Sequence, residues 1–310
     1  MPEIGKSQPL VVWIVSDGKP GHVNQSRGLA EALARATPTV THVLPALPAW
    51  RAWLAWVLKR LPGELLPAPD LIVGAGHATH MTLLAARRGR GGRAVVLMKP
   101  SLSRRCFDLC ILPQHDGIAV DAHTLVTEGA LNRIRPAATR DANHGLLLIG
   151  GTSSHFDWDG DAIQLQIRSI LTRTPDTHWT LTTSRRTPAE FLAELPPFPN
   201  LTVVPHTATP PDWLPAQLAE CGIVWVTPDS ASMVFEALSA GADVGVFDLP
   251  VNPKSRVAHA IAQLADARRI TRFVTWCASG TLHSNLHPLA EADRCATWIL
   301  TWLKNKKKTD

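Results

Sequence analysis

Short apolar runs rich in β-branched residues alternate along the whole chain with longer segments whose apolar residues follow helical spacing. Such uninterrupted runs are typical of strands that are buried on both faces of a parallel sheet. They lie at 10–15, 39–44, 70–74, 94–98 and 109–112 in the first half, and at 146–149, 179–182, 201–204, 222–226, 244–247 and 270–274 in the second. This rhythm predicts an α/β protein with two doubly wound, Rossmann-like parallel sheets.

A polar segment at 133–144, which contains Pro and shows no periodicity, separates the two series of elements. It is typical of an interdomain linker. We therefore expect an N-terminal domain at 1–138 and a C-terminal domain at 139–310, each long enough to bury its own core. Because ligands of such sheets bind beyond the carboxyl ends of the strands, the two domains are expected to face each other across a cleft.

The segment 221–250 has the clearest local organisation, namely strand, polar turn, helix and strand. Asp229, Ser230 or Ser232 can cap the helix, whose free N–H groups and dipole favour an anion such as phosphate. Glu236 lies within two turns of this helix end, where its carboxylate could accept hydrogen bonds from a ribose. An ordinary α/β unit with a solvated Glu would give the same pattern.

Glycines and polar residues also follow two other predicted strands of the second half. They are Gly150, Gly151 and Thr152 after one strand, and Ser184, Arg185 and Arg186 after the next. Two guanidinium groups beyond a strand end could bind a diphosphate through charge-assisted hydrogen bonds. Solvated surface arginines are an equally good explanation.

The first predicted strand ends in a glycine-containing loop, 16–22, that includes Asp17 and His22. Its sequence is neither GxGxxG nor a Walker loop, so the generic nucleotide fingerprints fail here. Both polar residues could simply cap the loop.

Two further strand ends in the first half carry candidate residues. Gly76 and His77 follow one strand, where a glycine allows either a ligand or a neighbouring element to come close. His115 and Asp116 follow the strand at 109–112, and a structural turn would explain them equally well.

Trp50, Trp53 and Trp56 fall at helical spacing on one side of the segment 45–61, which also carries basic residues: Arg51, Lys59 and Arg60. Interfacial tryptophans with flanking Lys and Arg are what a membrane-surface helix uses. Packing of the same side onto the sheet also explains the pattern. We prefer the packed interpretation because amphipathic helices in α/β domains are far commoner than interfacial ones.

The composition narrows the class of partner. Hydrophobic residues make up 45% and charged residues 18% of the chain, which indicates a globular protein. The net charge of +5 suits phosphorylated substrates or an anionic membrane surface without requiring either. The sequence lacks the interleaved aromatic and basic residues of a nucleic-acid reader.

Five cysteines, an odd number, stand mostly in apolar runs and indicate reduced, buried thiols. Cys106 and Cys110 have no second pair of ligands near them, so we expect no metal site. Neither a signal core nor a membrane-spanning run is recognisable. We expect a cytoplasmic protein whose contact with the inner membrane, if it has one, is peripheral.

Residues 16–29 read SDGKPGHVNQSRGL and reproduce the pattern SDGKPGHxNQSxGL of the mitochondrial-fission (elongated-mitochondria) family and its bacterial relatives. The chain resembles that family over most of its length, including the segments 113–116, 129–132 and 184–188. Strand or helix propensity does not explain the polar residues of these motifs. The resemblance implies that the acceptor or sugar side of a site includes Gly21, Asn24, Gln25, Gly76, His77, His115 and Asp116.

The stretch 227–250 resembles the donor-binding stretch of GT-B glycosyltransferases, in which a Ser-rich helix start meets the nucleotide diphosphate and a helix Glu holds the ribose. The resemblance places Ser230, Ser232 and Glu236 at a nucleotide-sugar site. It implies a GT-B-like fold, in which the last helix, 290–303, can return to the first domain.

Together these resemblances imply a glycosyltransferase that moves a sugar from a nucleoside-diphosphate sugar, of the UDP type, to an unknown glycan or lipid-linked acceptor without a cofactor. His22 is the expected base with Asp17 as the alternative, and the groups expected to stabilise the departing diphosphate are Ser230, Ser232, Arg185 and Arg186. A nucleotide-sugar epimerase shares this architecture and would use His77, His115 and Asp116. A non-catalytic adaptor with the same fold is the third alternative.

Overall fold

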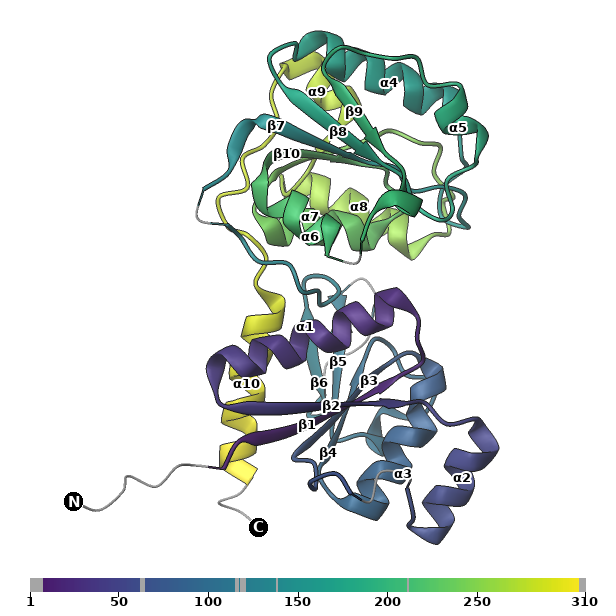
Figure 1. The fold of residues 1–310 in the computed structure, drawn as a ribbon, viewed down its shortest axis with the longest axis vertical. Helices are drawn as coiled ribbons and strands as arrows, with labels where there is room; N and C mark the ends of the chain where they lie inside the picture. The colour runs from purple at the N-terminus through teal and green to yellow at the C-terminus, as the bar shows by residue number, and fades with distance from the viewer. Residues whose placement is uncertain are drawn as a thin grey trace, which may run out of the picture. The chain divides into compact units, whose positions relative to one another are not determined.

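The structure is a computed structural model that describes residues 8–61, 65–114, 117, 121–137, 139–210 and 212–306. Within these residues the chain forms two six-stranded sheets in which every strand pair is parallel (Figure 1). The chain divides into two compact units: residues up to Arg133 together with those from Ala290 onward, and Ile134–Leu289. The predicted class, α/β with two doubly wound parallel sheets, is confirmed.

The sheet of the first unit has the strand order β2-β1-β3-β4-β5-β6. The strands are β1 Leu10–Ser16, β2 Thr39–Pro45, β3 Leu71–Ala75, β4 Arg93–Leu97, β5 Leu109–Pro113 and β6 Thr124–Thr127. From β1 the chain moves to β2 on one side and then returns to β3 on the other. The direction of winding therefore reverses between β1 and β3.

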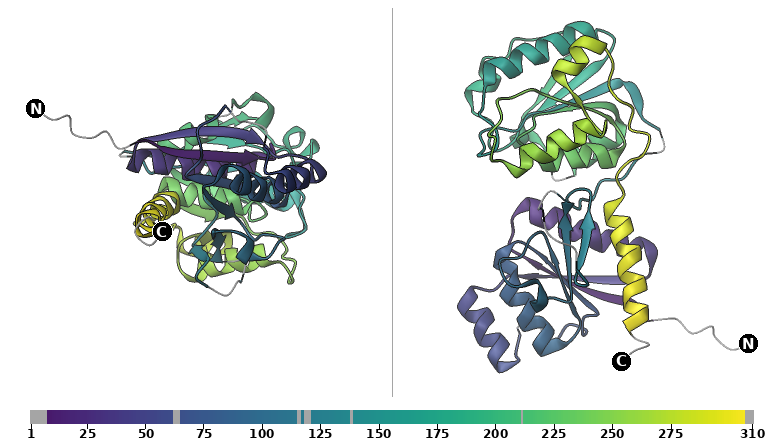
Figure 2. Two further views of the ribbon diagram at one scale, coloured as in Figure 1. Left: turned by 90° about the horizontal axis from the view of Figure 1, so that it is seen from below. Right: turned by 180° about the vertical axis from the view of Figure 1, so that it is seen from behind.

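Helices cover both faces of this sheet because successive residues of its strands point to opposite faces. Val12 and Ile14 pack under α1 (Pro20–Ala36) and α10 (Glu291–Lys306), whereas Trp13 and Val15 face α2 (Ala49–Leu58) and α3 (His80–Arg90). Figure 2 shows α10 beside α1, so the last helix of the chain completes the first unit.

The sheet of the second unit has the order β12-β11-β10-β7-β8-β9 and reverses its winding between β7 and β10. Its strands are β7 Asp141–Leu148, β8 His178–Thr182, β9 Leu201–Val204, β10 Cys221–Val226, β11 Asp243–Val246 and β12 Thr271–Arg272. Its helices are α4 Gly160–Arg173, α5 Glu190–Ala193, α6 Trp213–Glu220, α7 Ala231–Ala240, α8 Arg256–Asp266 and α9 Phe273–Ser279. In Figure 1, α4, α5 and α9 lie on one face of the sheet and α6, α7 and α8 on the other.

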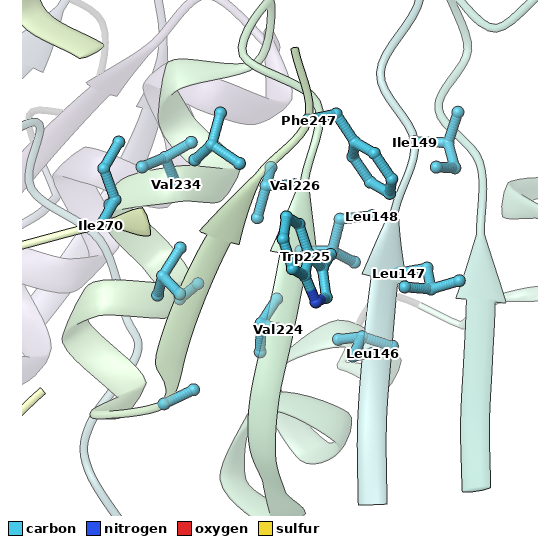
Figure 3. Close-up of a cluster of buried hydrophobic side chains, with 14 of the residues drawn as sticks. Leu146, Leu147, Leu148, Ile149, Val224, Trp225, Val226, Val234, Phe247 and Ile270 are labelled. Atoms are coloured by element: carbon cyan, nitrogen blue, oxygen red, sulfur yellow. The ribbon is translucent and has the colours of Figure 1, made fainter. Parts of the chain in front are cut away.

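The centre of the second unit is built from the apolar runs of β7 and β10, whose side chains are fully buried and interdigitate with Phe247 (Figure 3). Two strand glycines each make room for a large indole on the adjacent strand. Gly145 lies opposite Trp179, Gly245 lies opposite Trp225, and a Cβ on either glycine would overlap the indole ring. These glycines in strands are explained by close packing.

Four predicted details differ from the structure. β7 begins at Asp141, inside the predicted linker. The sequence did not indicate this start because the first residues of the strand are exposed and polar. The strand expected at 270–274 is the two-residue β12 followed by the helix α9, since a short apolar run does not distinguish the two. The short β6 and α6 were not predicted.

The prediction that the tryptophans of α2 pack onto the sheet was wrong for Trp50 and Trp53. Trp50 and Trp53 are 64% and 57% exposed, and Trp56 is half-buried. The residues that α2 buries are Ala52 and Ala55. Small side chains let α2 approach α3 closely, so the large apolar side chains on its opposite face remain outside the core.

All five cysteines are free thiols. Cys110, Cys221 and Cys295 are buried as expected, and burial raises the pKa of each thiol to about 12. Cys277 is exposed, which corrects the expectation for that residue. In the described part of the chain, no helix has the length and apolar character needed to cross a membrane.

Candidate functional site

Ligands of doubly wound sheets bind beyond the carboxyl ends of the strands, where the winding reverses. In the first unit this point lies after β1 and β3, that is, at Asp17 and Gly76. In the second unit it lies after β7 and β10, at Gly150 and Thr227. Asp17, Gly76, Gly150 and Thr227 therefore lie at the strand ends where this topology builds its sites.

Asp17 and His22 form a hydrogen-bonded pair beyond the end of β1. The His22 Nδ1 lies 2.8 Å from Asp17 Oδ2, and the side chains are 19% and 6% exposed. Burial alone would raise the pKa of Asp17, but hydrogen bonds from His22 and the Lys19 N–H outweigh it, so the pKa lies below its ordinary value. An ionised Asp17 can only accept, which makes Nδ1 the protonated nitrogen and leaves the Nε2 lone pair for a reacting group.

Gly76, at the end of β3, has a positive φ of 83°, and a Cβ there would overlap the His22 ring. The glycine is explained by the close approach of the His22 side chain, without a ligand. Gly76 thus determines where the His22 imidazole lies relative to the sheet edge.

The other described candidates of the first unit differ in exposure. Gly21 is exposed, and Asn24 and Gln25 are half-buried in α1. His77 is exposed in a 3₁₀ turn directly after Gly76. His115 and Asp116 lie outside the described residues, so their predicted role stays a prediction.

Gly150 and Gly151 follow β7 and are held by side chains from two other strand ends. The Gly150 N–H donates to Thr227 Oγ1 at 2.7 Å, and the Gly151 N–H donates to Asp229 Oδ2 at 3.0 Å. The Ser184 hydroxyl donates to the Gly150 carbonyl at 2.8 Å. A Cβ at Gly150 would overlap the Asp229 carboxylate, so glycine is required here by this packing.

Arg186 is part of the same scaffold. Its NH2 lies 2.8 Å from Asp229 Oδ2, and its NH1 donates to the Thr152 carbonyl at 2.9 Å. The Asp229 side chain is only 1% exposed, and Arg186 is 40% exposed. The ion pair neutralises both charges, so Arg186 positions the loop, whereas its neighbour Arg185 is exposed.

The N-terminus of α7 begins beside these two loops. Ser230 is the N-cap residue, but its side chain makes no capping hydrogen bond, and the first turn contains no acidic residue. Ser232 and Glu236 are four residues apart and therefore share one face of the helix, one turn from each other. Ser230 is buried, Ser232 is exposed and Glu236 is half-buried.

Sequence reasoning missed the hydroxyl residues that fix this site. Thr227 holds Gly150, and Thr187 accepts from the Ser184 N–H at 2.8 Å and donates to the Gly150 carbonyl. A threonine directly after a buried strand was the available signal for Thr227. Across the described ranges, no three His, Cys, Asp or Glu side chains are grouped so that they could hold a metal ion.

Two doubly wound parallel sheets of this topology define a protein with the GT-B fold, which its solved structural relatives share. The chain belongs to the mitochondrial fission ELM1 family, whose model matches residues 20–303. No curated protein matches the sequence.

The structural relatives have low sequence identity to this chain, and several of their names include a UDP-sugar. A putative UDP-N-acetylglucosamine 2-epimerase from Listeria monocytogenes has a TM-score of 0.66 at 12% identity and covers 98% of both chains. MurG of Acinetobacter baumannii has a TM-score of 0.52 at 14% identity, with 94% of this chain and 100% of that chain covered. The UDP-GlcNAc 2-epimerase from Neisseria meningitidis, bound to UDP-GlcNAc, has a TM-score of 0.52 at 11% identity, with 96% and 100% covered.

Proposed function

We propose that the second unit binds a nucleoside-diphosphate sugar of the UDP type and that the protein transfers its sugar to an acceptor at the first unit. The observation that carries the proposal is the N-terminus of α7 at the winding reversal, with Ser232 and Glu236 on one helix face. Free N–H groups and the helix dipole favour a diphosphate at that end. The Neisseria relative with the same fold is bound to UDP-GlcNAc.

The local charges support an anion at this place. Asp229 directly precedes the N-cap residue of α7, and its charge is offset by Arg186 at 2.8 Å. Arg185 is exposed beside it. In the proposed reaction Arg185, Ser230 and the helix end stabilise the negative charge that develops on the leaving diphosphate, and no metal is needed.

The Asp17–His22 pair is the proposed base. Asp17 orients the imidazole through Nδ1, and Nε2 takes the proton of the acceptor hydroxyl as that oxygen attacks the sugar. The proposed acceptor is a glycan or a lipid-linked molecule.

Epimerisation of the bound sugar is the second candidate, favoured by the TM-score of 0.66 to a protein described as a putative epimerase. His77, His115 and Asp116 would then act on the sugar. A fission-type adaptor that binds the nucleotide without turnover is the third.

Thermal unfolding in the presence of nucleotides tests the proposal. UDP and UDP-GlcNAc should raise the apparent stability by about 2.7 kcal/mol at one hundred times Kd, and UMP much less, because the second phosphate occupies the helix end. No shift with any nucleoside diphosphate would refute it. Release of UDP only when an acceptor is present identifies a transferase, sugar interconversion without an acceptor identifies an epimerase, and binding without either identifies an adaptor.

A further inference from the structure

The helix α2 has apolar residues on both of its faces, and within the described residues only one of these faces is buried. Ala52 and Ala55 point into the unit and are buried. One half-turn away, at the same spacing of three and four residues, the opposite face exposes larger apolar side chains. This face, called the α2 outer face here, consists of Trp50, Trp53, Leu54, Val57 and Leu58.

The α2 outer face is large for an exposed apolar patch. An aromatic side chain of this size covers about 150–250 Å², so Trp50 at 64% and Trp53 at 57% exposure alone present on the order of 200–300 Å². The three aliphatic residues enlarge it further. Contiguous exposed patches of this size mark interaction surfaces.

Basic side chains surround the patch. The Arg51 guanidinium lies 5.0 Å from the centre of the Trp50 ring, and the Arg88 guanidinium of α3 lies 4.3 Å from that of Trp56. Lys59 is exposed at the end of the helix, as Arg60 is in the next position. The sequence of α2 has no acidic residue, and none occurs between Asp70 and Asp108, a range that includes all of α3.

We propose that the α2 outer face docks on the surface of an anionic phospholipid bilayer. Ten helical residues span about 15 Å, too short to cross a membrane, so the helix lies in the plane of the interface with its apolar face inserted. Tryptophans at the headgroup level and Arg or Lys side chains that reach the lipid phosphates are the chemistry of such a helix.

The position of α2 connects docking to the site in the first unit. α2 begins at Ala49, soon after β2 ends at Pro45, so the N-terminal end of the helix is close along the chain to the carboxyl end of the sheet, the edge that carries Asp17 and His22 (Figure 1). Docking would bring this edge near the bilayer surface. Delivery of a lipid-linked acceptor by this docking rests on the proposed function. The docking of α2 on the bilayer does not depend on it.

Vesicle co-sedimentation of the full chain tests the docking. The wild-type protein should bind phosphatidylcholine–phosphatidylglycerol vesicles at low salt, bind less at high salt, and bind phosphatidylcholine alone weakly. The double substitution Trp50→Ala and Trp53→Ala should weaken partitioning about tenfold or more, because affinity scales with the apolar area inserted. Lys59→Gln with Arg60→Gln should weaken it roughly tenfold on anionic vesicles only.

The control is Leu165→Ala, which removes a 66% exposed apolar side chain from the second unit and should leave vesicle binding unchanged. All substituted positions are exposed, so thermal unfolding midpoints should match the wild type. The proposal is overturned if the wild type binds neither vesicle, if the double substitution binds equally well, or if it abolishes self-association in a chain that does not bind vesicles. If Glu236→Ala loses nucleotide binding but still binds vesicles, the result supports docking through α2 independently of the nucleotide site.

Discussion

Glu236 offers the sharpest test of the nucleotide site, because one side chain on a well-formed helix carries the proposed ribose contact. Its Cα lies five residues into α7, roughly 7–8 Å along the axis from the first helical residue. This is about one turn beyond Ser232 on the same face. A nucleotide whose diphosphate meets the helix end can place its ribose against the carboxylate at that separation.

The expected loss follows from two opposing effects. A ribose hydroxyl that donates to a carboxylate contributes about 1.5–3 kcal/mol. Repulsion between Glu236 and one diphosphate charge at 7–8 Å costs about 0.5 kcal/mol at the dielectric constant of water and about 2 kcal/mol at the value of about 20 that suits pairs near a protein surface. Where solvent screens the repulsion the hydrogen bond is the larger effect, so Glu236→Ala should weaken UDP binding by roughly 1–3 kcal/mol, or about 5- to 150-fold in Kd.

Isothermal titration with UDP measures this change, and 2′-deoxy-UDP and 3′-deoxy-UDP show whether it comes from the ribose. The wild type should lose affinity for one of these analogues, and Glu236→Ala should not lose it a second time, since both changes remove the same bond. Glu220→Ala, an exposed carboxylate at the end of α6, is the matched control and should bind normally. Alanine is a good helix former, so the helix is retained. Equal UDP affinity in a folded Glu236→Ala protein would refute the assignment.

Three further predictions concern the two strand-end sites. Gly150→Ala should lower the free energy of unfolding by about 1–3 kcal/mol, because the new Cβ would overlap the Asp229 carboxylate. Gly21→Ala is the control and should not lower it, because a Cβ there meets no atom within 4 Å. Equal urea unfolding midpoints for the two variants would contradict this. Because the pKa of Asp17 is depressed in the folded state, its stabilisation is present above the unfolded value of 3.8 and lost as pH falls through the folded value. The stability difference between wild type and Asp17→Asn should therefore shrink as pH falls below about 5, and a pH-independent difference would argue against the ionised pair. In a turnover assay, His22→Gln should reduce the rate by about 10²–10⁴ with UDP affinity unchanged, and a parallel loss of affinity or stability would instead indicate a loop-capping histidine.

The strand ends were predictable from sequence because the signals there are local. Uninterrupted apolar runs followed by glycine and polar residues identified the loops at Asp17, Gly76, Gly150 and Thr227 without any knowledge of the sheet order. The Asp17–His22 pair is also local, since five residues separate its members within one loop and the first turn of α1. β12 and α9 were not distinguished because an apolar run of a few residues has no decisive period.

The sequence by itself determined two doubly wound sheets, since periodicity and buried strands are properties of neighbouring residues. Only the tertiary structure decided that Arg186 and Asp229, forty-three positions apart, neutralise each other, because charge pairing leaves no trace in periodicity. It also decided which face of α2 is buried. Both faces of that helix are apolar. The face with Ala52 and Ala55 is the buried one because only small side chains allow α2 to approach α3 closely. Trp50 and Trp53 on the opposite face therefore remain at the surface.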